Sequence, residues 1–141
     1  MGRLVHIDSP SAERQRLRRT IAEALHLLVK KPELDAEAKD LAALIVLALR
    51  EISRIIENSA TAWDKRHYYI KADQLRAEWE WAERAAERME SLIRVGDWPR
   101  LPVALAALVP RFHDIKVKKV TRSNNLWSGS YALLMEKPKP Q

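Results

Sequence analysis

The chain has 141 residues, of which 47% are hydrophobic and 31% charged, and its formal net charge is +6. This length and composition are typical of one folded domain and exclude a disordered chain. The lack of cysteine excludes disulfides, thiolate metal ligands and a cysteine nucleophile.

Two features bear on the location of the protein. The longest apolar run, residues 41–49, is about half the length that spans a bilayer, and the opening residues MGRLVHIDSPSAERQ lack the apolar core of a secretory signal. We therefore expect no membrane contact and a cytoplasmic protein. The positive charge is concentrated towards the two ends of the chain, which favours an anionic partner or simply maintains solubility.

The first two predicted helices have clear starts. Residues 10–31 should form a helix that begins after Ser9 and ends before Pro32, with one apolar stripe. A second helix should begin after Asp35. It carries two apolar rows, so we expect it to be the central helix with neighbours on more than one side. The stripe of the first helix comprises Leu17, Ile21, Leu25 and Leu28.

The boundary between the second and third helices is marked by a change of phase. The apolar row shifts by about one residue, or about 100° around a helix, between the two segments. Asn58 tolerates the conformation that ends helices, and Thr61 with Asp64 forms an acidic variant of a capping box. We therefore predict a break at 58–61 and a third helix at 61–95. Its main row predicts that Tyr68, Leu75 and Trp79 pack against the second helix.

The remaining elements are shorter. Prolines at 99, 102 and 110 frame a short fourth helix whose leucines at 101, 105 and 108 face inward. From residue 115 the pattern alternates, which predicts a β-hairpin at 115–135, and residues 3–7 are a candidate third strand. The expected fold is a mainly α antiparallel bundle of three long helices and one short one with this small sheet. It would form a single domain at 1–137, followed by a disordered tail at 138–141.

One helical face mixes a phenol, a carboxylate and cations. Arg66, Tyr69, Asp73 and Arg76 share this face of the third helix, so they are a candidate ligand-binding site. The same face would serve equally well as a buried polar seam or as the rim of a dimer.

A second candidate site is cationic. If the termini meet in one sheet, six basic side chains from the first helix and the first hairpin strand would share a surface that could hold a phosphate backbone. Trp127 and Tyr131 would be stacking partners, although a place in the core suits them better. The six are Arg14, Arg18, Arg19, Lys116, Lys118 and Arg122.

A third candidate is an interface. Trp63, Ile70 and Trp81 lie on a second apolar row of the third helix, which an isolated subunit would not leave bare. Either another part of the chain or a second subunit in a homodimer should cover this row.

Metal and catalytic chemistry receive little support. The pairs Glu23 with His26 and Asp64 with His67 have the spacing of di-iron ligands, but the helical pattern places them on polar faces. The chain contains no nucleotide-binding or nucleophile-elbow motif, and three glycines are too few for a phosphate-cradling loop. We expect no metal, no cofactor and no catalytic residues.

These patterns favour a non-catalytic binding or assembly module that acts through protein contacts or self-association. Two alternatives stay open. One is a basic accessory protein that binds RNA or single-stranded DNA without sequence specificity. The other is a small-molecule-binding protein or enzyme with a polar pocket near Arg66, Asp73 and Arg76.

Overall fold

The structure is a computed structural model that describes residues 9–138. Three long helices come first: α1 (Pro10–Val29), α2 (Ala36–Lys65) and α3 (Tyr69–Val95). The shorter elements that follow are η1 (Trp98–Arg100), α4 (Leu101–Leu108), η2 (Val109–Arg111), α5 (Asn124–Trp127) and α6 (Ser130–Glu136). The candidate strand at 3–7 lies outside the described residues, as does the predicted tail beyond residue 138.

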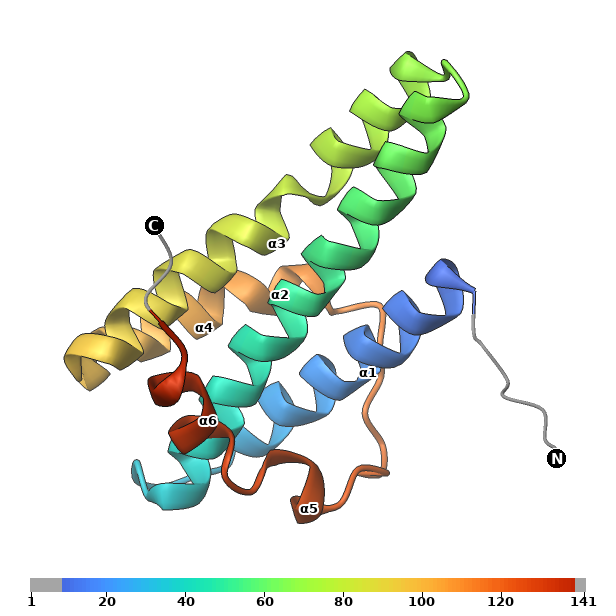
Figure 1. The fold of residues 1–141 in the computed structure, drawn as a ribbon. Coiled ribbons are helices and arrows are strands. Elements are labelled where there is room, and N and C mark those ends of the chain that lie inside the picture. Colours follow the sequence, from blue (N-terminus) through green and yellow to red (C-terminus); the bar gives the residue numbers. More distant parts are fainter. Residues whose placement is uncertain (1–8, 139–141) are drawn as a thin grey trace, which may run out of the picture.

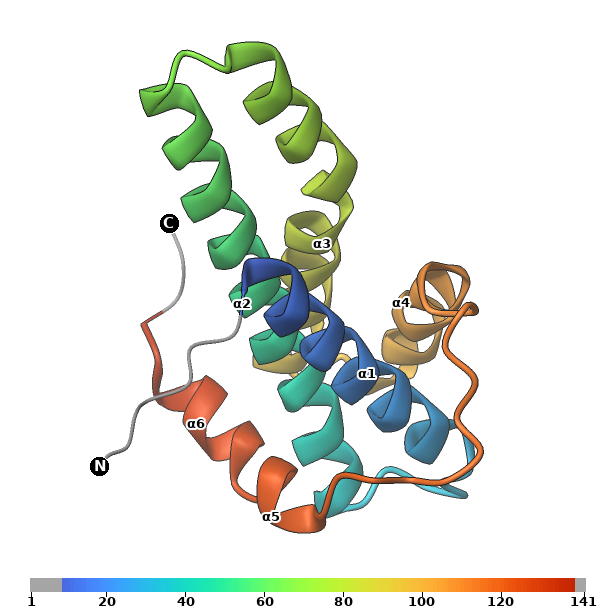
Figure 2. The same ribbon diagram turned by 90° about the vertical axis from the view of Figure 1, so that its right-hand side faces the viewer.

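α2 is the central helix, as its two apolar rows predict. α3 runs along one side of it, α1 crosses another side, and α6 lies against its first turns (Figure 1, Figure 2). Leu41, Ile45, Leu49 and Ile52 of α2 have no exposed surface. Because burial of each such side chain contributes roughly 1.5–3 kcal/mol, α2 supplies much of the hydrophobic stabilisation.

α2 continues through the predicted break at 58–61. Ala60 is fully buried in this stretch, and this burial stabilises the continued helix. Thr61 Oγ1 donates a hydrogen bond to the Glu57 carboxylate (3.1 Å) and does not cap a new helix. The prediction of a break is confirmed, but its position was wrong, since α3 begins only at residue 69.

The chain reverses at residues 66–68. His67 adopts a left-handed conformation with φ 66°, which closes α2 as a glycine or asparagine commonly does. The Trp63 carbonyl accepts hydrogen bonds from the amides of Arg66 (3.0 Å) and Tyr68 (2.9 Å). α2 and α3 therefore form an antiparallel arm that extends beyond the other helices (Figure 1).

The predicted contact row of α3 is partly confirmed. Ala72, Ala82, Ala86, Met89 and Ile93 are buried. Leu75 and Trp79 are half-buried against the core. Tyr68, however, lies in the turn and is 55% exposed, so its predicted place in the core was wrong.

The predicted β-hairpin is wrong, because no strand occurs between residues 9 and 138. Side chains of α1 bind the backbone groups that a strand would pair. The Glu23 carboxylate accepts hydrogen bonds from the amides of Thr121 (2.7 Å) and Arg122 (2.9 Å). The Arg19 guanidinium donates to the carbonyls of Lys116 (3.3 Å) and Lys119 (2.9 Å). This segment therefore follows α1 as an irregular chain (Figure 2).

The second half of the predicted hairpin is helical. Trp127 of α5 is buried, and in α6 Ser130 and Leu134 are buried and Tyr131 is half-buried, at the three-to-four spacing of a helix. Leu133 and Met135, which were expected on the same side, are 50% and 38% exposed. The period along this stretch is therefore that of a helix and not that of a strand.

Two buried carboxylates join distant segments. Burial raises the pKa of Glu23, but hydrogen bonds from Thr121, Arg122 and Arg19 outweigh burial and lower the pKa to about 2. Burial also raises the pKa of Glu90, while hydrogen bonds from Arg94 and Arg50 give a net lowering. Arg94 donates further hydrogen bonds to the carbonyls of Leu134 (3.1 Å) and Lys137 (2.9 Å), which ties α6 to α3.

Candidate functional site

The structure places the predicted polar set near the tip of the α2–α3 arm. Arg76 is paired there with carboxylates of both helices, since its Nη2 lies 2.9 Å from Glu57 and 2.8 Å from Asp64. The contact to Asp73 is longer, at 3.5 Å. The hydrogen bonds that Arg76 donates to Glu57 and Asp64 raise the pKa of Arg76. Arg76 therefore joins the two helices of the arm and is already neutralised.

Arg66 and Tyr69, the other two members of this set, form no hydrogen bond or ion pair with Arg76. The Tyr69 hydroxyl lies 2.8 Å from Nδ1 of His67, and the Arg66 side chain is exposed. The four residues share one end of the arm, but the polar contact among them is the long pair of Asp73 and Arg76 within α3. The arrangement explains the turn better than it explains a binding site.

Three of the six predicted cations fasten the segment 111–122 to α1. Arg18 pairs with Asp114 at 2.8 Å and donates to the Arg111 carbonyl at 2.8 Å. Arg19 binds Glu23 and the carbonyls described above. Arg122 donates to the Thr20 hydroxyl (3.1 Å) and to the Arg16 carbonyl (3.0 Å).

The remaining cations are differently placed. Lys116 and Lys118 are exposed on this segment. The Arg14 guanidinium lies over the Trp79 ring, at 5.4 Å. The structure thus brings Arg18, Arg19 and Arg122 together along α1, although the described residues form no sheet.

The predicted interface residues have different surroundings. Trp63 is half-buried and lies under the Lys71 ammonium (5.4 Å), whereas Ile70 is 76% exposed at the tip of the arm. Trp81 packs on Phe112 of the same chain, with 5.8 Å between ring centroids. Phe112 therefore covers part of Trp81, which is half-buried, and self-association across this row stays a prediction.

A site that the sequence did not reveal lies between α1 and α4. It is an apolar groove of about 640 Å³, which we call the α1–α4 groove, and its volume is typical of ligand-binding sites. The C-terminal end of α1, the loop before α2, the start of α2 and the η1–α4 segment form its walls. The lining comprises Leu25, Leu28, Val29, Lys31, Glu33, Leu34, Ala38, Trp98, Pro99, Leu101, Pro102, Leu105, Ala106 and Val109.

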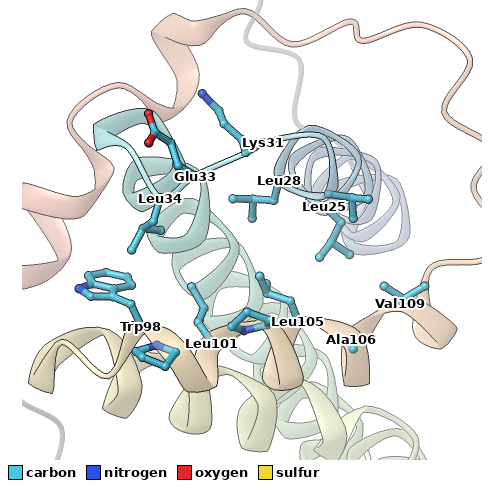
Figure 3. Close-up of a pocket in the computed structure, with 14 residues that line it drawn as sticks. Leu25, Leu28, Lys31, Glu33, Leu34, Trp98, Leu101, Leu105, Ala106 and Val109 are labelled. Carbon is cyan, nitrogen blue, oxygen red and sulfur yellow. The ribbon is translucent and has the colours of Figure 1, made fainter.

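Figure 3 shows how the α1–α4 groove is arranged. Leu28 of α1 and Leu101 and Leu105 of α4 point into the gap between the helices, and Leu34 points towards Trp98. Lys31 and Glu33 lie at the rim with their charged groups directed away from α4. The interior is therefore apolar and the polar groups are confined to its edge.

The charges at the rim have a structural role. The Lys31 ammonium lies 3.0 Å from Asp35 and also binds Glu37, and the hydrogen bonds that it donates to Glu37 and Asp35 raise the pKa of Lys31. These ion pairs hold the loop between α1 and α2. The groove can therefore bind apolar groups by desolvation, while the charged side chains of its lining, Lys31 and Glu33, lie at its rim.

Sequence patterns could not reveal this groove because its lining resembles an ordinary core stripe. Leu25 and Leu28 belong to the predicted stripe of α1, and Leu101 and Leu105 to that of α4. The prolines of the sequence did indicate one cause of the groove, the short length of α4. They limit α4 to 8 residues, or about 12 Å, whereas α1 has 20 residues and spans about 30 Å. α4 is too short to cover the whole apolar face that α1 turns towards it.

Within residues 9–138, no three His, Asp or Glu side chains gather as a metal site requires. No helix in the same range combines the length and the apolar character needed to cross a membrane. Comparisons with protein-family models, with curated proteins and with solved structures gave no match to this chain.

Proposed function

We propose that the chain is a non-catalytic docking module that binds an amphipathic helix of a partner protein in the α1–α4 groove. The observation that carries this proposal is the exposed apolar rim of the groove. Val29 is 77% exposed, Val109 46% and Leu34 39%. Large apolar side chains exposed around a concave apolar surface are characteristic of interaction sites.

A helix fits this surface better than a small molecule does. A small ligand would fill the interior of the groove but leave a rim residue such as Val29 in water. A bound helix inserts side chains at three-to-four spacing into the groove, while its neighbouring residues cover the rim. The burial of the rim would add to the affinity, because desolvation of apolar surface is the main favourable contribution.

The rim of the α1–α4 groove carries both charges, Lys31 and Glu33, whereas the net charge of the chain favours an acidic partner. Lys30 is exposed at the end of α1, lines the adjoining hollow beneath Val29, and forms no ion pair within the described residues. The chain as a whole carries a net charge of +6. Acidic residues that flank the apolar face of the partner helix would complement this charge and speed association.

The alternative of an enzyme or small-molecule site near Arg66, Asp73 and Arg76 is less well supported. Arg76 already pairs with Glu57 and Asp64, so a ligand would have to displace two carboxylates.

Selection from a displayed library of helical peptides tests the proposal. Peptides selected on the protein should carry apolar residues at i, i+3, i+4 and i+7 with acidic neighbours. The Ala106→Arg substitution would place a charged side chain in the groove and should weaken their binding by at least about tenfold.

Val103→Arg is the matched control, because Val103 is exposed on the same helix and does not line the groove. It should leave peptide binding unchanged. Selected peptides that bind Ala106→Arg as tightly as the unaltered protein would disprove the proposal, as would equal losses in both variants.

A further inference from the structure

A second surface combines tryptophans with arginines. Two hollows, of about 310 Å³ and about 210 Å³, share Trp81 and Arg111 in their linings. The first continues to Arg14, Arg18 and Trp79, and the second to Arg84 and Arg88. Together they form a surface between the N-terminal half of α1, the middle of α3 and the end of α4. We call it the arginine–tryptophan groove.

The two indole rings of this groove stack on each other, and a guanidinium group lies over each of them. Trp79 and Trp81 lie 5.8 Å apart between ring centroids, with an angle of 30° between their planes. The Arg14 guanidinium lies 5.4 Å from the centroid of Trp79, and that of Arg111 lies 4.9 Å from the centroid of Trp81. These cation–π contacts hold both guanidinium groups in place before any ligand arrives.

Several of these arginines lack an acidic partner. Arg14, Arg88 and Arg111 form no ion pair with a carboxylate within residues 9–138, whereas Arg18 is held by Asp114. Glu78 is the acidic side chain in the lining of the two hollows. Arg84 lies 3.6 Å from Glu80, but carboxylates within the described residues do not neutralise the charges of Arg14, Arg88 and Arg111. Arginine presents several N–H donors in a planar fork that matches phosphate oxygens.

We propose that the arginine–tryptophan groove binds single-stranded nucleic acid without sequence specificity. The guanidinium groups of Arg14, Arg88 and Arg111 would contact successive phosphates, and bases would stack on the indole and guanidinium planes. Base stacking on such groups and a cationic path along the backbone are the two components of non-specific single-strand binding.

A strand fits this groove better than an enclosed nucleotide does. One hollow lies at the lower end of the ~300–1,000 Å³ range of small-molecule sites, and the other lies below it. The unpaired cations also come from three different elements, α1, α3 and η2, so they are spread along the groove. This surface differs from the cationic set that the sequence indicated, since Arg84, Arg88, Arg111 and both tryptophans were not part of that set.

Fluorescence anisotropy with ~12-nucleotide labelled oligothymidylate and oligouridylate tests the proposal. Both strands should bind at ~50 mM salt, with affinity that falls steeply as salt rises and with quenching of the protein's tryptophan fluorescence. The Arg14→Gln/Arg111→Gln double variant should lose about tenfold in affinity. Its slope of log K against log salt should be shallower by about 1.4, the value for two lost phosphate contacts on a single strand.

The Lys65→Gln/Arg100→Gln variant is the control, because it removes the same charge from exposed positions outside the groove. It should bind as the unaltered protein does, and circular dichroism should show both variants folded. The proposal is overturned if neither strand binds at low salt, or if the control variant loses as much affinity as the Arg14→Gln/Arg111→Gln variant. It is also overturned if polyglutamate of the same charge binds as tightly as the oligonucleotides.

Discussion

At the scale of single residues, Glu23 joins α1 to Thr121 and Arg122, which lie 98 and 99 positions later in the chain. Its side chain is 1% exposed and accepts hydrogen bonds from two amides, a hydroxyl and a guanidinium. A carboxylate with so many donors strongly prefers its ionised form. The sequence placed this residue on a polar face, and it was paired with His26 only as a weak metal candidate. Its true partners could not be inferred, because they lie in a segment that was expected to be a strand.

The stability of the protein should therefore fall in acid. The folded-state pKa of Glu23 is about 2, against 4.5 for the ordinary carboxyl. Because the folded chain binds this proton more weakly, the contribution of Glu23 to the free energy of unfolding is complete above about pH 4.5 and is lost as the pH falls towards 2. It amounts to about 3 kcal/mol. Urea denaturation of the Glu23→Gln variant should show about this loss at pH 7 and little difference from the unaltered protein near pH 2.

Glu87→Gln is the matched control, since Glu87 is an exposed residue of α3. It should shift the denaturation midpoint little at either pH. If Glu23→Gln were as stable as the control at pH 7, the attachment of residues 121–122 to α1 would be wrong.

His67 offers a test of the turn between α2 and α3. A left-handed φ of 66° is accessible to glycine and strongly disfavours β-branched residues. Thermal unfolding should therefore rank His67→Gly as at least as stable as the unaltered protein and His67→Val as less stable by about 1–2 kcal/mol. Equal stability of the valine and glycine variants would contradict a reversal at this residue.

At the scale of elements, α6 begins without a side-chain cap of its own. Its N-cap is Gly129, with φ 85°, and the missing acceptor comes from α2. The Asp40 carboxylate accepts hydrogen bonds from the amides of Gly129 (3.1 Å) and Tyr131 (2.9 Å). α6 is thus capped by the helix on which it packs.

Removal of this cap should loosen α6 selectively. We expect Asp40→Ala to cost about 1 kcal/mol, the usual value of an N-cap, and to speed hydrogen exchange at the amides of residues 131–134. Asp73→Ala removes a carboxylate that is 78% exposed and should leave exchange in α6 unchanged. Uniform acceleration over all helices in Asp40→Ala would contradict a local capping role.

The predictions for these elements succeeded where the helical period persists over many residues. α1 and α4 begin and end near their flanking prolines and caps, and the two rows of α2 identified the central helix. Two failures have the same physical origin. Asn58 and Thr61 are good turn formers, but the burial of Ala60 outweighs their preference, and the alternation of residues 115–121 reflects contacts with α1 in place of strand pairing. Tertiary contacts decided both outcomes, and no local pattern contains them.

At the scale of the whole molecule, the two proposed surfaces lie on either side of α4. The α1–α4 groove is lined by Leu101, Leu105 and Ala106, whereas the arginine–tryptophan groove continues past Ala104 and Ala107. The sequence predicted neither groove as a site, although it indicated the apolar or basic character of many of the lining residues. Their hydrophobic or basic character is visible in the sequence, but a groove depends on which elements meet and on how much of each face stays uncovered.

The position of an uncharged apolar probe is the most direct measurement of the central claim, that the α1–α4 groove is an open apolar binding surface. Nile red can be titrated into protein with labelled methyl groups and followed by NMR. The methyl resonances of Leu25, Leu28, Leu101 and Leu105 should shift in a saturable manner, and Ala106→Arg should abolish these shifts. Shifts confined to the methyl groups of the arm, such as those of Ile55 and Ile70, or shifts that persist in Ala106→Arg, would contradict the claim.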